Sequence, residues 1–304
     1  MKICMTGTTS FSGYWFARQL ILEGHELTII RSRSMNLAGS KNLWLSRLDE
    51  ESLTYREISS AQEIVTKLNF DVLLLHGSFM EDRRSPNFNV QIAVQKTLQV
   101  SNWIKNCFRV DNVIHTGTFS EENEGIGDEP LNNFNPYSAS KSLIYKEHQK
   151  IFSGIPLLKF TMPNPFGRFQ QNNLFSFLEG AWAKKEVPLI SHPEYIRDYV
   201  PVELLAISYA KLIESFIAGR YSLNCFAPSY FVMSNRDISK LYASEISLRI
   251  GRNLEILFGE QAVYSESRVR VNRDPLHQII DNWSLEKFWD SMAIDFLGVK
   301  NATN

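Results

Sequence analysis

The sequence predicts an α/β protein built on a Rossmann-like, doubly wound parallel sheet, with a smaller mixed region toward the C-terminus. Two observations predict this class. Short apolar stretches alternate with segments of helical periodicity through the first half, and a glycine-containing turn follows the first apolar stretch. Strands that are separated by helices pair in parallel, and such sheets bind ligands at the carboxyl ends of their strands.

The first elements form one strand–helix–strand unit. Residues 2–6 (KICMT) predict a short buried strand, residues 12–24 a helix that ends at Gly24, and residues 25–34 a second strand that runs into polar residues. A unit of about 30 residues is typical of a βαβ motif.

The same alternation continues along the chain. Apolar stretches predict three further strands, at residues 71–78, 112–118 and 156–164. Residues 89–106 have the spacing of a helix between the first two, and another helix precedes the third. From about Pro165 onward the turn residues become irregularly spaced, which predicts the second, smaller region.

Composition argues against several classes of partner. Lys and Arg number 32 against 33 Asp and Glu, so the net charge of -1 gives no global field that would attract nucleic acid or an anionic membrane. The three cysteines lack the spacing of a zinc site or a disulfide framework, which is typical of a reducing compartment. No stretch approaches the roughly 20 apolar residues of a membrane span, and the first residues show no charged leader. We expect a cytoplasmic protein without a bound metal.

The turn after the first strand, TGTTSFSG, matches a GxxGxxG dinucleotide motif whose middle glycine is replaced by serine. Small residues here let the backbone and the amides of the helix N-terminus approach a pyrophosphate, and a serine hydroxyl can itself donate to phosphate. A tight turn that binds nothing is the alternative, because such a turn alone is not specific. The cofactor contacts expected in the turn are Gly7, Thr9, Ser10, Phe11 and Gly13.

The end of the second strand indicates which dinucleotide such a turn would hold. An acidic residue at this position binds the ribose 2′-hydroxyl of NAD, whereas a nearby arginine accommodates the 2′-phosphate of NADP. The sequence has Arg31 and Arg33 here and no acid, so NADP(H) is favoured. NAD(H) is the alternative, in which the two arginines only increase the solubility of a loop. After a neighbouring strand, His76, Gly77 and Ser78 are expected to line the same cofactor site.

The segment YSASK places Tyr137 and Lys141 one turn apart at the start of a predicted helix. An ammonium beside a phenol favours the phenolate, which lowers the pKa of the tyrosine and suits it to general acid or base catalysis. A solvated helix face is the commoner explanation of such a pair. Upstream, the stretch VIHTGTFS ends a predicted strand with hydroxyls at Thr116, Thr118 and Ser120, where a substrate-orienting group is expected, although simple turn chemistry also explains Thr116 and Ser120.

Several segments, taken in order, resemble the extended short-chain dehydrogenase/reductases of the NAD(P)-dependent epimerase/dehydratase family, which act on nucleotide sugars. They are the glycine turn, Asn89 in FNVQIAVQKTLQ, the hydroxyl-bearing strand end, the Tyr137/Lys141 pair, PNPFGR and IRDYVPVELLA. The resemblance covers most of the chain, and the Tyr/Lys pair together with RDYV is its most specific part. It implies that Tyr137 is the catalytic acid/base, that Lys141 holds the nicotinamide ribose, and that Thr118 hydrogen-bonds the reacting sugar oxygen.

The resemblance also implies three contacts to a nucleotide-diphosphate sugar, from Asn164, Arg197 and Arg273. From the residues alone, Arg197 beside Asp198 is equally compatible with a surface ion pair, and the stretch RVRVNRD is first of all an exposed strand face. Family members pair through helices that correspond to residues 89–105 and 138–152, so a homodimer is implied by resemblance.

Domain boundaries follow from the change of pattern and from the resemblance. We expect a dinucleotide-binding domain over residues 1–164 and a mainly substrate-binding region over residues 165–304. A segment near 221–240 is expected to return to the first domain.

Departures from the family pattern bear on the reaction. Family dehydratases carry an acidic pair directly after the catalytic threonine, whereas Phe119 and Ser120 stand there in this chain. Glu121 and Glu122 follow, and we expect this displacement to turn them away from the substrate. Dehydration is therefore disfavoured, which leaves ketone reduction or epimerisation. Because NADPH suits a net reduction, the sequence favours an NADPH-dependent reductase of a nucleotide-linked keto-deoxysugar; the alternatives are an epimerase with tightly bound NAD and a non-enzymatic member, against which the intact catalytic residues argue.

Overall fold

The computed structural model describes residues 1–31, 43–60, 67–79, 87–276 and 283–302. The chain divides into two compact units. The first is formed by Met1–Glu124, Leu131–Met162 and Ala206–Ala227, and the second by Gly125–Pro130, Pro163–Leu205 and Pro228–Asn304. Within the described part of the chain, no helix is both long and apolar enough to cross a membrane.

A seven-stranded sheet forms the centre of the first unit. Its strand order is β13-β9-β7-β5-β1-β2-β3, and every pairing is parallel. The strands are β1 (Lys2–Thr6), β2 (Glu26–Arg31), β3 (Arg56–Ser59), β5 (Val72–Leu75), β7 (Val113–Thr118), β9 (Leu157–Met162) and β13 (Cys225–Phe226). The direction of strand addition reverses between β1 and β5, and doubly wound sheets bind ligands at the strand carboxyl ends beside such a reversal. The predicted fold class is confirmed.

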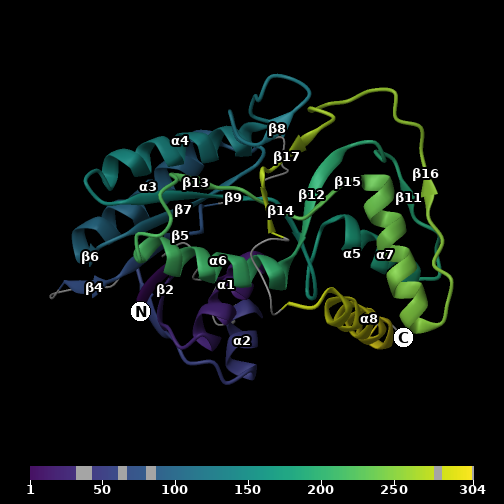
Figure 1. Cartoon of the computed structure of the whole chain (residues 1–304), viewed down its shortest axis with the longest axis horizontal. Coiled ribbons are helices and arrows are strands. Elements are labelled where there is room, and N and C mark those ends of the chain that lie inside the picture. Colours follow the sequence, from purple (N-terminus) through teal and green to yellow (C-terminus); the bar gives the residue numbers. More distant parts are fainter. Residues whose placement is uncertain (32–42, 61–66, 80–86, 277–282, 303–304) are drawn as a thin grey trace. The chain divides into compact units, whose positions relative to one another are not determined.

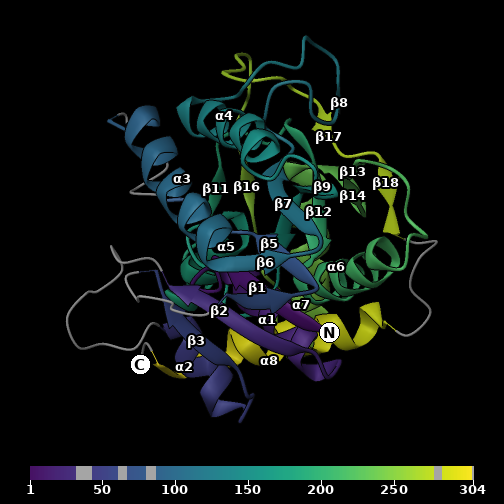
Figure 2. The same ribbon diagram turned by 90° about the vertical axis from the view of Figure 1, so that its left-hand side faces the viewer.

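Helices cover both faces of this sheet (Figures 1 and 2). The helices are α1 (Phe11–Leu22), α2 (Leu43–Glu50), α3 (Val90–Cys107), α4 (Pro136–Ile151) and α6 (Val202–Ile217), the last belonging to the first unit from Ala206 onward. Helices α3 and α4 lie side by side on one face, and α1 and α6 lie on the other. On that second face the rings of Phe16, Phe160 and Tyr209 pack together, with Tyr209 4.3 Å from Phe16 and 4.7 Å from Phe160 between ring centroids.

Helix α2 and strand β3, which follow β2 in the chain, are not predicted from the sequence. Strand β3 lies at the edge of the sheet and buries only Ile58, so its four residues have too few apolar positions for a period to be recognised. Two further short strands, β4 (Leu68–Phe70) and β6 (Phe108–Val110), pair in parallel beside the main sheet and were not expected either.

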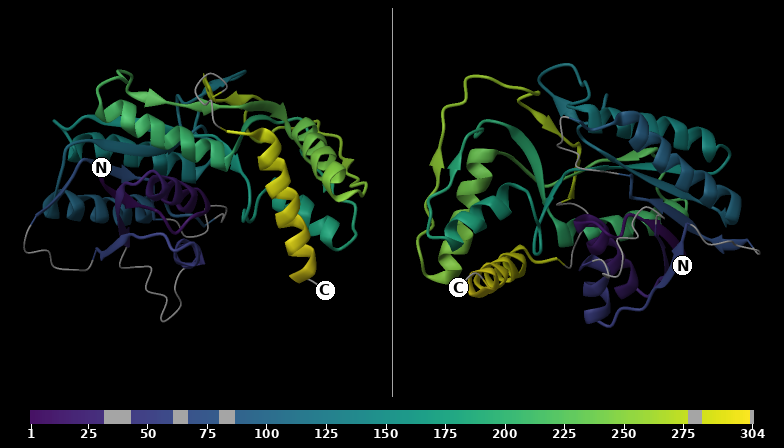
Figure 3. Two further views of the ribbon diagram at one scale, coloured as in Figure 1. Left: turned by 60° about the horizontal axis from the view of Figure 1, so that its bottom comes forward. Right: turned by 180° about the vertical axis from the view of Figure 1, so that it is seen from behind.

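The second unit has a mixed three-stranded sheet of order β10-β12-β15. Strand β10 (Asn164–Phe166) runs parallel to β12 (Ile196–Pro201), and β15 (Phe231–Ser234) runs antiparallel to it. Helices α5 (Leu174–Ala183), α7 (Asn235–Ile250) and α8 (Leu285–Ala302) belong to the same unit, with α7 and α8 packed together (Figure 3). Its core is rich in aromatic side chains, among them Phe166, Phe175, Trp182, Tyr242 and Trp289.

Three pairs of two-residue strands complete the second unit. They are β8 (Ile126–Gly127) with β17 (Arg270–Val271), β11 (Leu189–Ile190) with β16 (Leu257–Phe258), and β14 (Pro228–Ser229) with β18 (Asp274–Pro275). The first pair is antiparallel and takes one strand from the loop that follows β7, the strand that ends at Thr118. Mixed pairing of this kind is the smaller mixed region that the sequence predicts.

Candidate functional site

The glycine turn after β1 is packed against the chain that leaves β5. Gly7 has φ +80, and a Cβ built there would lie 2.4 Å from the backbone nitrogen of Gly77. Only glycine satisfies both the left-handed backbone and this close approach. The two strand ends beside the reversal of strand order are thus held in direct backbone contact.

Ser10, which replaces the middle glycine, is the N-cap of α1. Its hydroxyl donates to the carbonyl oxygen of Gly7 at 2.8 Å and accepts from the amide of Gly13 at 3.2 Å. The serine therefore closes the turn through its side chain, and the contact of its hydroxyl to a phosphate stays a prediction. Thr9 and Phe11 beside it are half-buried, and the ring of Phe11 lies 6.0 Å from that of Trp44.

The turn retains the features that a bound pyrophosphate needs. The first amides of α1 have no partner within the helix and carry the positive end of its dipole, which favours an anion. The hydroxyl oxygen of Thr8 is buried in the turn and has no hydrogen-bond partner among the described residues. These features fit a dinucleotide.

The end of β2 differs from a simple basic site. The guanidinium of Arg31 forms an ion pair with Glu57 of the adjacent strand β3, with 2.7 Å between Nη2 and Oε1 and about a third of each side chain exposed. Arg33, the second predicted contact to a 2′-phosphate, lies outside the described residues. The sequence has no carboxylate at the end of β2 itself, and the fold supplies one, Glu57, from the neighbouring strand.

His76, at the end of β5, joins two elements that bear predicted site residues. Its Nε2 lies 3.0 Å from the hydroxyl of Ser12 in α1, and its Nδ1 lies 3.1 Å from the hydroxyl of Thr116 in β7. Burial, and then the charge of Lys141, lower the pKa of His76 to about 3, so the imidazole is neutral. Gly77 follows it and donates its amide to the hydroxyl of Thr6 at 3.2 Å, and Ser78 is half-buried.

Lys141 is buried beneath the start of α4. Its ammonium donates to the backbone carbonyl of Thr116 at 2.6 Å, and its side chain is almost fully shielded from water. Burial lowers its pKa to about 8, against an opposing contribution from Glu121. Tyr137, one turn earlier on the same helix, is half-buried, and its ring lies 6.2 Å from that of Phe88.

Hydroxyl groups link the end of β7 to the start of α4. Ser120 lies 3.2 Å from Thr118 between hydroxyl oxygens, and the hydroxyl of Ser138 donates to Ser120 at 2.8 Å. Ser138 directly follows Tyr137, and its amide donates to the N-cap residue Asn135 at 3.0 Å. These hydroxyls connect Thr118 at the end of β7 to the residue that follows Tyr137 in α4.

A buried ion cluster behind Thr118 was not predicted. Lys159 of β9 donates to Glu121 at 2.6 Å and to Glu124 at 2.7 Å, and all three side chains are largely or wholly buried. Glu121 also accepts the amide of Thr118 at 2.7 Å. The signal that points to such a cluster is a lysine inside an apolar strand, since a buried ammonium requires a partner.

The predicted substrate residues lie in the second unit. Arg197 is buried, and its guanidinium donates to the carbonyl oxygens of Ile196, Ser267 and Arg268 and to the carboxylate of Glu266, at 2.7 to 3.0 Å. The partners from residues 266–268 show that Arg197 holds that segment, a role that sequence reasoning did not assign to it. Asn164 is half-buried at the start of β10 beside Tyr199, and Arg273 is exposed.

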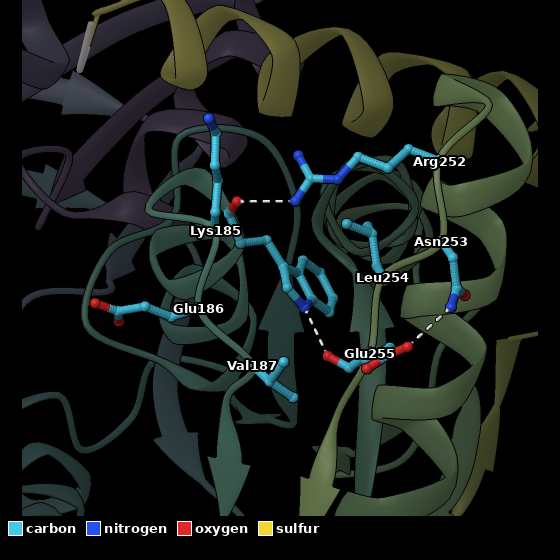
Figure 4. Close-up of a pocket in the computed structure, with 8 residues that line it drawn as sticks. Lys185, Glu186, Val187, Arg252, Asn253, Leu254 and Glu255 are labelled. Atoms are coloured by element: carbon cyan, nitrogen blue, oxygen red, sulfur yellow. Dashed lines mark hydrogen bonds between the residues drawn. The ribbon is translucent and has the colours of Figure 1, made fainter.

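Asn89, the other asparagine of the resemblance, caps α3 by accepting the amide of Ile92 at 2.9 Å. The second unit also contains a surface cavity of about 180 Å³ (Figure 4). The indole of Trp182 donates there to the carbonyl of Glu255 at 2.9 Å, and Arg252 reaches the carbonyl of Trp182 at 3.3 Å. None of the predicted site residues lines this cavity.

Comparison with known proteins agrees with this geometry. The profile of the NAD dependent epimerase/dehydratase family matches residues 3–221, which is more than half of the chain. The protein belongs to this family. It is therefore an enzyme of the NAD-dependent epimerase/dehydratase family, and the resemblance inferred from the sequence is confirmed. A search of curated proteins finds no match.

Solved structures of similar fold include several epimerases. The UDP-glucuronic acid 4-epimerase of Bacillus cereus, in complex with UDP-glucuronic acid and NAD, has a TM-score of 0.68 at 17% identity and covers 98% of this chain and 100% of its own. The UDP-glucose 4-epimerase of Thermus thermophilus in complex with NAD has 0.67 at 14%, covering 98% and 99%. The UDP-N-acetylglucosamine 4-epimerase of Methanobrevibacter ruminantium has 0.66 at 17%, covering 98% of each chain. At these identities the likeness shows the fold.

Proposed function

We propose that the protein is a nucleotide-sugar epimerase that uses a retained NAD(P) cofactor. The observation that carries the proposal is the set of hydrogen bonds between the end of β7 and the start of α4. Ser120 links the hydroxyl of Thr118 to Ser138, the residue after Tyr137. Lys141 of the same helix donates to the carbonyl of Thr116. The similarity in fold to epimerases whose structures contain NAD supports epimerisation over net reduction, which the sequence alone favours. The net reduction becomes the second candidate.

The chain's own residues supply the proton chemistry. Tyr137 removes the proton from the reacting sugar hydroxyl and returns it afterwards, and Thr118 orients that oxygen by a hydrogen bond. Lys141 in its charged form stabilises the phenolate of Tyr137. A bound nicotinamide supplies the acceptor and donor of the hydride at the same carbon. The residues proposed to hold it are those of the glycine turn, His76 to Ser78 and Lys141.

The Arg31–Glu57 pair bears on the identity of the cofactor. Glu57 offers a carboxylate beside the end of β2, where NAD-binding sheets present an acid to the ribose 2′-hydroxyl. It also neutralises the guanidinium that would attract a 2′-phosphate. We therefore propose NAD(H) as the resident cofactor. NADP(H), which the charge of Arg31 favours, is the alternative.

The second unit is proposed to bind the nucleotide sugar, as the whole-chain similarity in fold to UDP-sugar epimerases supports. Asn164 and Arg273 are the proposed contacts to the diphosphate. Arg197 contributes chiefly by fixing residues 266–268, because its buried guanidinium is already committed to them. A homodimer formed through α3 and α4 is proposed as well, supported by the exposed apolar side chains of Ile92 and Leu143 on these helices.

The experiment that tests the function supplies UDP-glucose, UDP-N-acetylglucosamine and UDP-glucuronic acid without added cofactor or reductant. The expected result is formation of the corresponding 4-epimer of one of them, detected by NMR, and its loss in Tyr137→Phe. Consumption of added NADPH in step with product, and no reaction without it, would contradict the epimerase and support the reductase.

The reductase is retained as a second candidate because Arg31 stands where many NAD-binding sheets carry an acid. Dehydration has no such support. Glu121, the nearest acid after Thr118, has one carboxylate oxygen on the amide of Thr118 and the other on Lys159, so neither is free for proton transfer to a substrate.

A further inference from the structure

Glu121 lies beside Thr118 at the end of β7 and has no part in the proton chemistry proposed for Tyr137, Thr118 and Lys141. Its side chain is fully buried. Its Oε1 accepts the amide of Thr118 at 2.7 Å, and its Oε2 accepts from the ammonium of Lys159 at 2.6 Å. One carboxylate thus joins the backbone of Thr118 to the neighbouring strand β9.

The surrounding residues are shaped to hold this carboxylate. Lys159 is buried as well, and it also donates to Glu124, whose other oxygen accepts the hydroxyl of Thr161 at 2.9 Å. Strand β7 has glycine at position 117, where a Cβ would lie 2.4 Å from Cε of Lys159 and 2.7 Å from Oε1 of Glu121. Any other residue at this position would displace the cluster. The cluster contains two carboxylates and one ammonium, so its formal net charge is one negative.

We propose that Glu121 is a positioning residue of the catalytic site, which fixes the backbone of Thr118 and places a negative charge behind Lys141. The proposal rests on the proposed function for the roles of Thr118 and Lys141. It adds that the acid which follows the catalytic threonine, displaced from the position that dehydratases use, has an electrostatic task in this chain.

Lys141 and Glu121 bond the backbone of the same strand two residues apart, at the carbonyl of Thr116 and the amide of Thr118. The charges that act on Lys141 come from several elements. Burial lowers its pKa, Glu121 raises it, and Lys159 lowers it. Among the described residues, the histidines His76, His115 and His148 also interact with Lys141, and Tyr137 precedes it by one turn on the same helix. Burial lowers the pKa of each histidine, and Lys141 lowers it further, so all three are neutral at working pH. Within the described part of the chain, Glu121 is thus the carboxylate whose charge raises the pKa of Lys141.

The first test measures the pKa of Lys141 directly, by ¹⁵N-lysine NMR of the full chain without substrate. The resonance is assigned by its loss in Lys141→Met. In Glu121→Gln we expect the pKa of Lys141 to fall by about one unit, because an opposite charge is removed from a buried site. In Lys159→Met we expect it to rise, because a like charge is removed. Glu124→Gln is the matched control, since Glu124 binds the same lysine but is not a cause of the Lys141 shift.

The opposite signs distinguish this role from a merely structural one. If the cluster only supported the fold, both Glu121→Gln and Lys159→Met would admit water and raise the pKa of Lys141. A rise or no change in Glu121→Gln overturns the proposal. Should that variant fail to fold, Glu121→Gln/Lys159→Met removes both charges together, and its Lys141 pKa is expected to lie near that of the parent protein; a clear rise there also overturns the proposal.

The second test follows the amide of Thr118 by hydrogen exchange. In Glu121→Ala we expect the protection of the Thr118 amide against exchange to fall by at least about tenfold, because the acceptor of that amide is removed. Glu124→Gln retains the acceptor and should retain the protection. Equal protection in the parent and in Glu121→Ala contradicts the anchoring of Thr118. Both tests are made without turnover, so they succeed or fail independently of the epimerase assignment.

Discussion

The Arg31–Glu57 pair predicts how the cofactor preference responds to one charge. In Glu57→Gln, Arg31 loses its partner and the repulsion between Glu57 and a 2′-phosphate disappears. We expect affinity for NADPH to rise by about tenfold, which corresponds to 1.4 kcal/mol. Affinity for NADH should fall or stay within about threefold, because only its uncharged hydroxyl meets the changed group.

The magnitude follows from the exposure of the pair. Each side chain is about a third exposed, and the N–O distance is 2.7 Å. An exposed pair of this kind contributes roughly 0.2 to 1 kcal/mol, whereas a charge-assisted contact to phosphate contributes about 1.5 to 3 kcal/mol. Exchange of the ion pair with Glu57 for a contact between Arg31 and the 2′-phosphate therefore favours NADPH. Because both are electrostatic and partly exposed, the effect should shrink as salt concentration rises.

The assay is fluorescence titration of NADH and NADPH into the parent protein, Glu57→Gln and Arg31→Ala after removal of any retained nucleotide. Glu51→Gln is a matched control, since Glu51 pairs with Arg18 at 2.6 Å with similar exposure. The control should leave the ratio of the two affinities unchanged. An unchanged ratio in both Glu57→Gln and Arg31→Ala would refute the placement of this pair beside the ribose.

Three further predictions concern the catalytic edge and the turn. Tyr137→Phe should lower turnover by about 10² or more while cofactor binding and thermal unfolding change little, since positioned proton transfer contributes 10² to 10⁴; full turnover would remove Tyr137 from its role. The pKa of Lys141 is lowered to about 8, so the ammonium is lost as pH rises through 8 and kcat/KM should fall there; a constant rate up to pH 10 would contradict this. Ser10→Ala should cost roughly 1 kcal/mol in urea denaturation and Ser10→Gly only a few tenths, because glycine also caps helices; equal losses would contradict the capping role.

Much of the first unit could be predicted because its strands are buried on both faces. β5 is a continuous apolar run, and β1, β7 and β9 contain short apolar stretches, all separated by segments of helical periodicity. This alternation predicts a parallel, doubly wound sheet, although it does not give the order of the strands. The proposed catalytic pair could be recognised for a different reason. Tyr137 and Lys141 are four residues apart in one helix, so their proximity is a local property of the sequence.

The residues that escaped prediction are brought together by the sheet. Glu57 reaches Arg31 only because β3 pairs with β2, and β3 is a short edge strand without a clear period. Lys159 reaches Glu121 from β9, which pairs with β7. Such contacts depend on register and burial, which a single sequence does not determine.

The arginine of RDYV has partners that the sequence does not indicate. Its residue type suggests an anion site, yet Arg197 finds its acceptors about 70 residues later, in the carbonyls of Ser267 and Arg268. The hydroxyl of Ser10 likewise has a backbone partner that the motif does not indicate, the carbonyl of Gly7, and its contact to a phosphate stays a prediction. In both residues a buried or half-buried polar group is satisfied by nearby backbone, which a motif alone does not reveal.

The proposed epimerase retains its dinucleotide and uses it without net consumption. Mass spectrometry of the small molecules released by denaturing the freshly purified protein measures this retention. We expect NAD(H) in an amount approaching one per chain. Release of no dinucleotide, together with reversible binding of NADPH and its oxidation in step with product, would rule out the epimerase and establish the reductase.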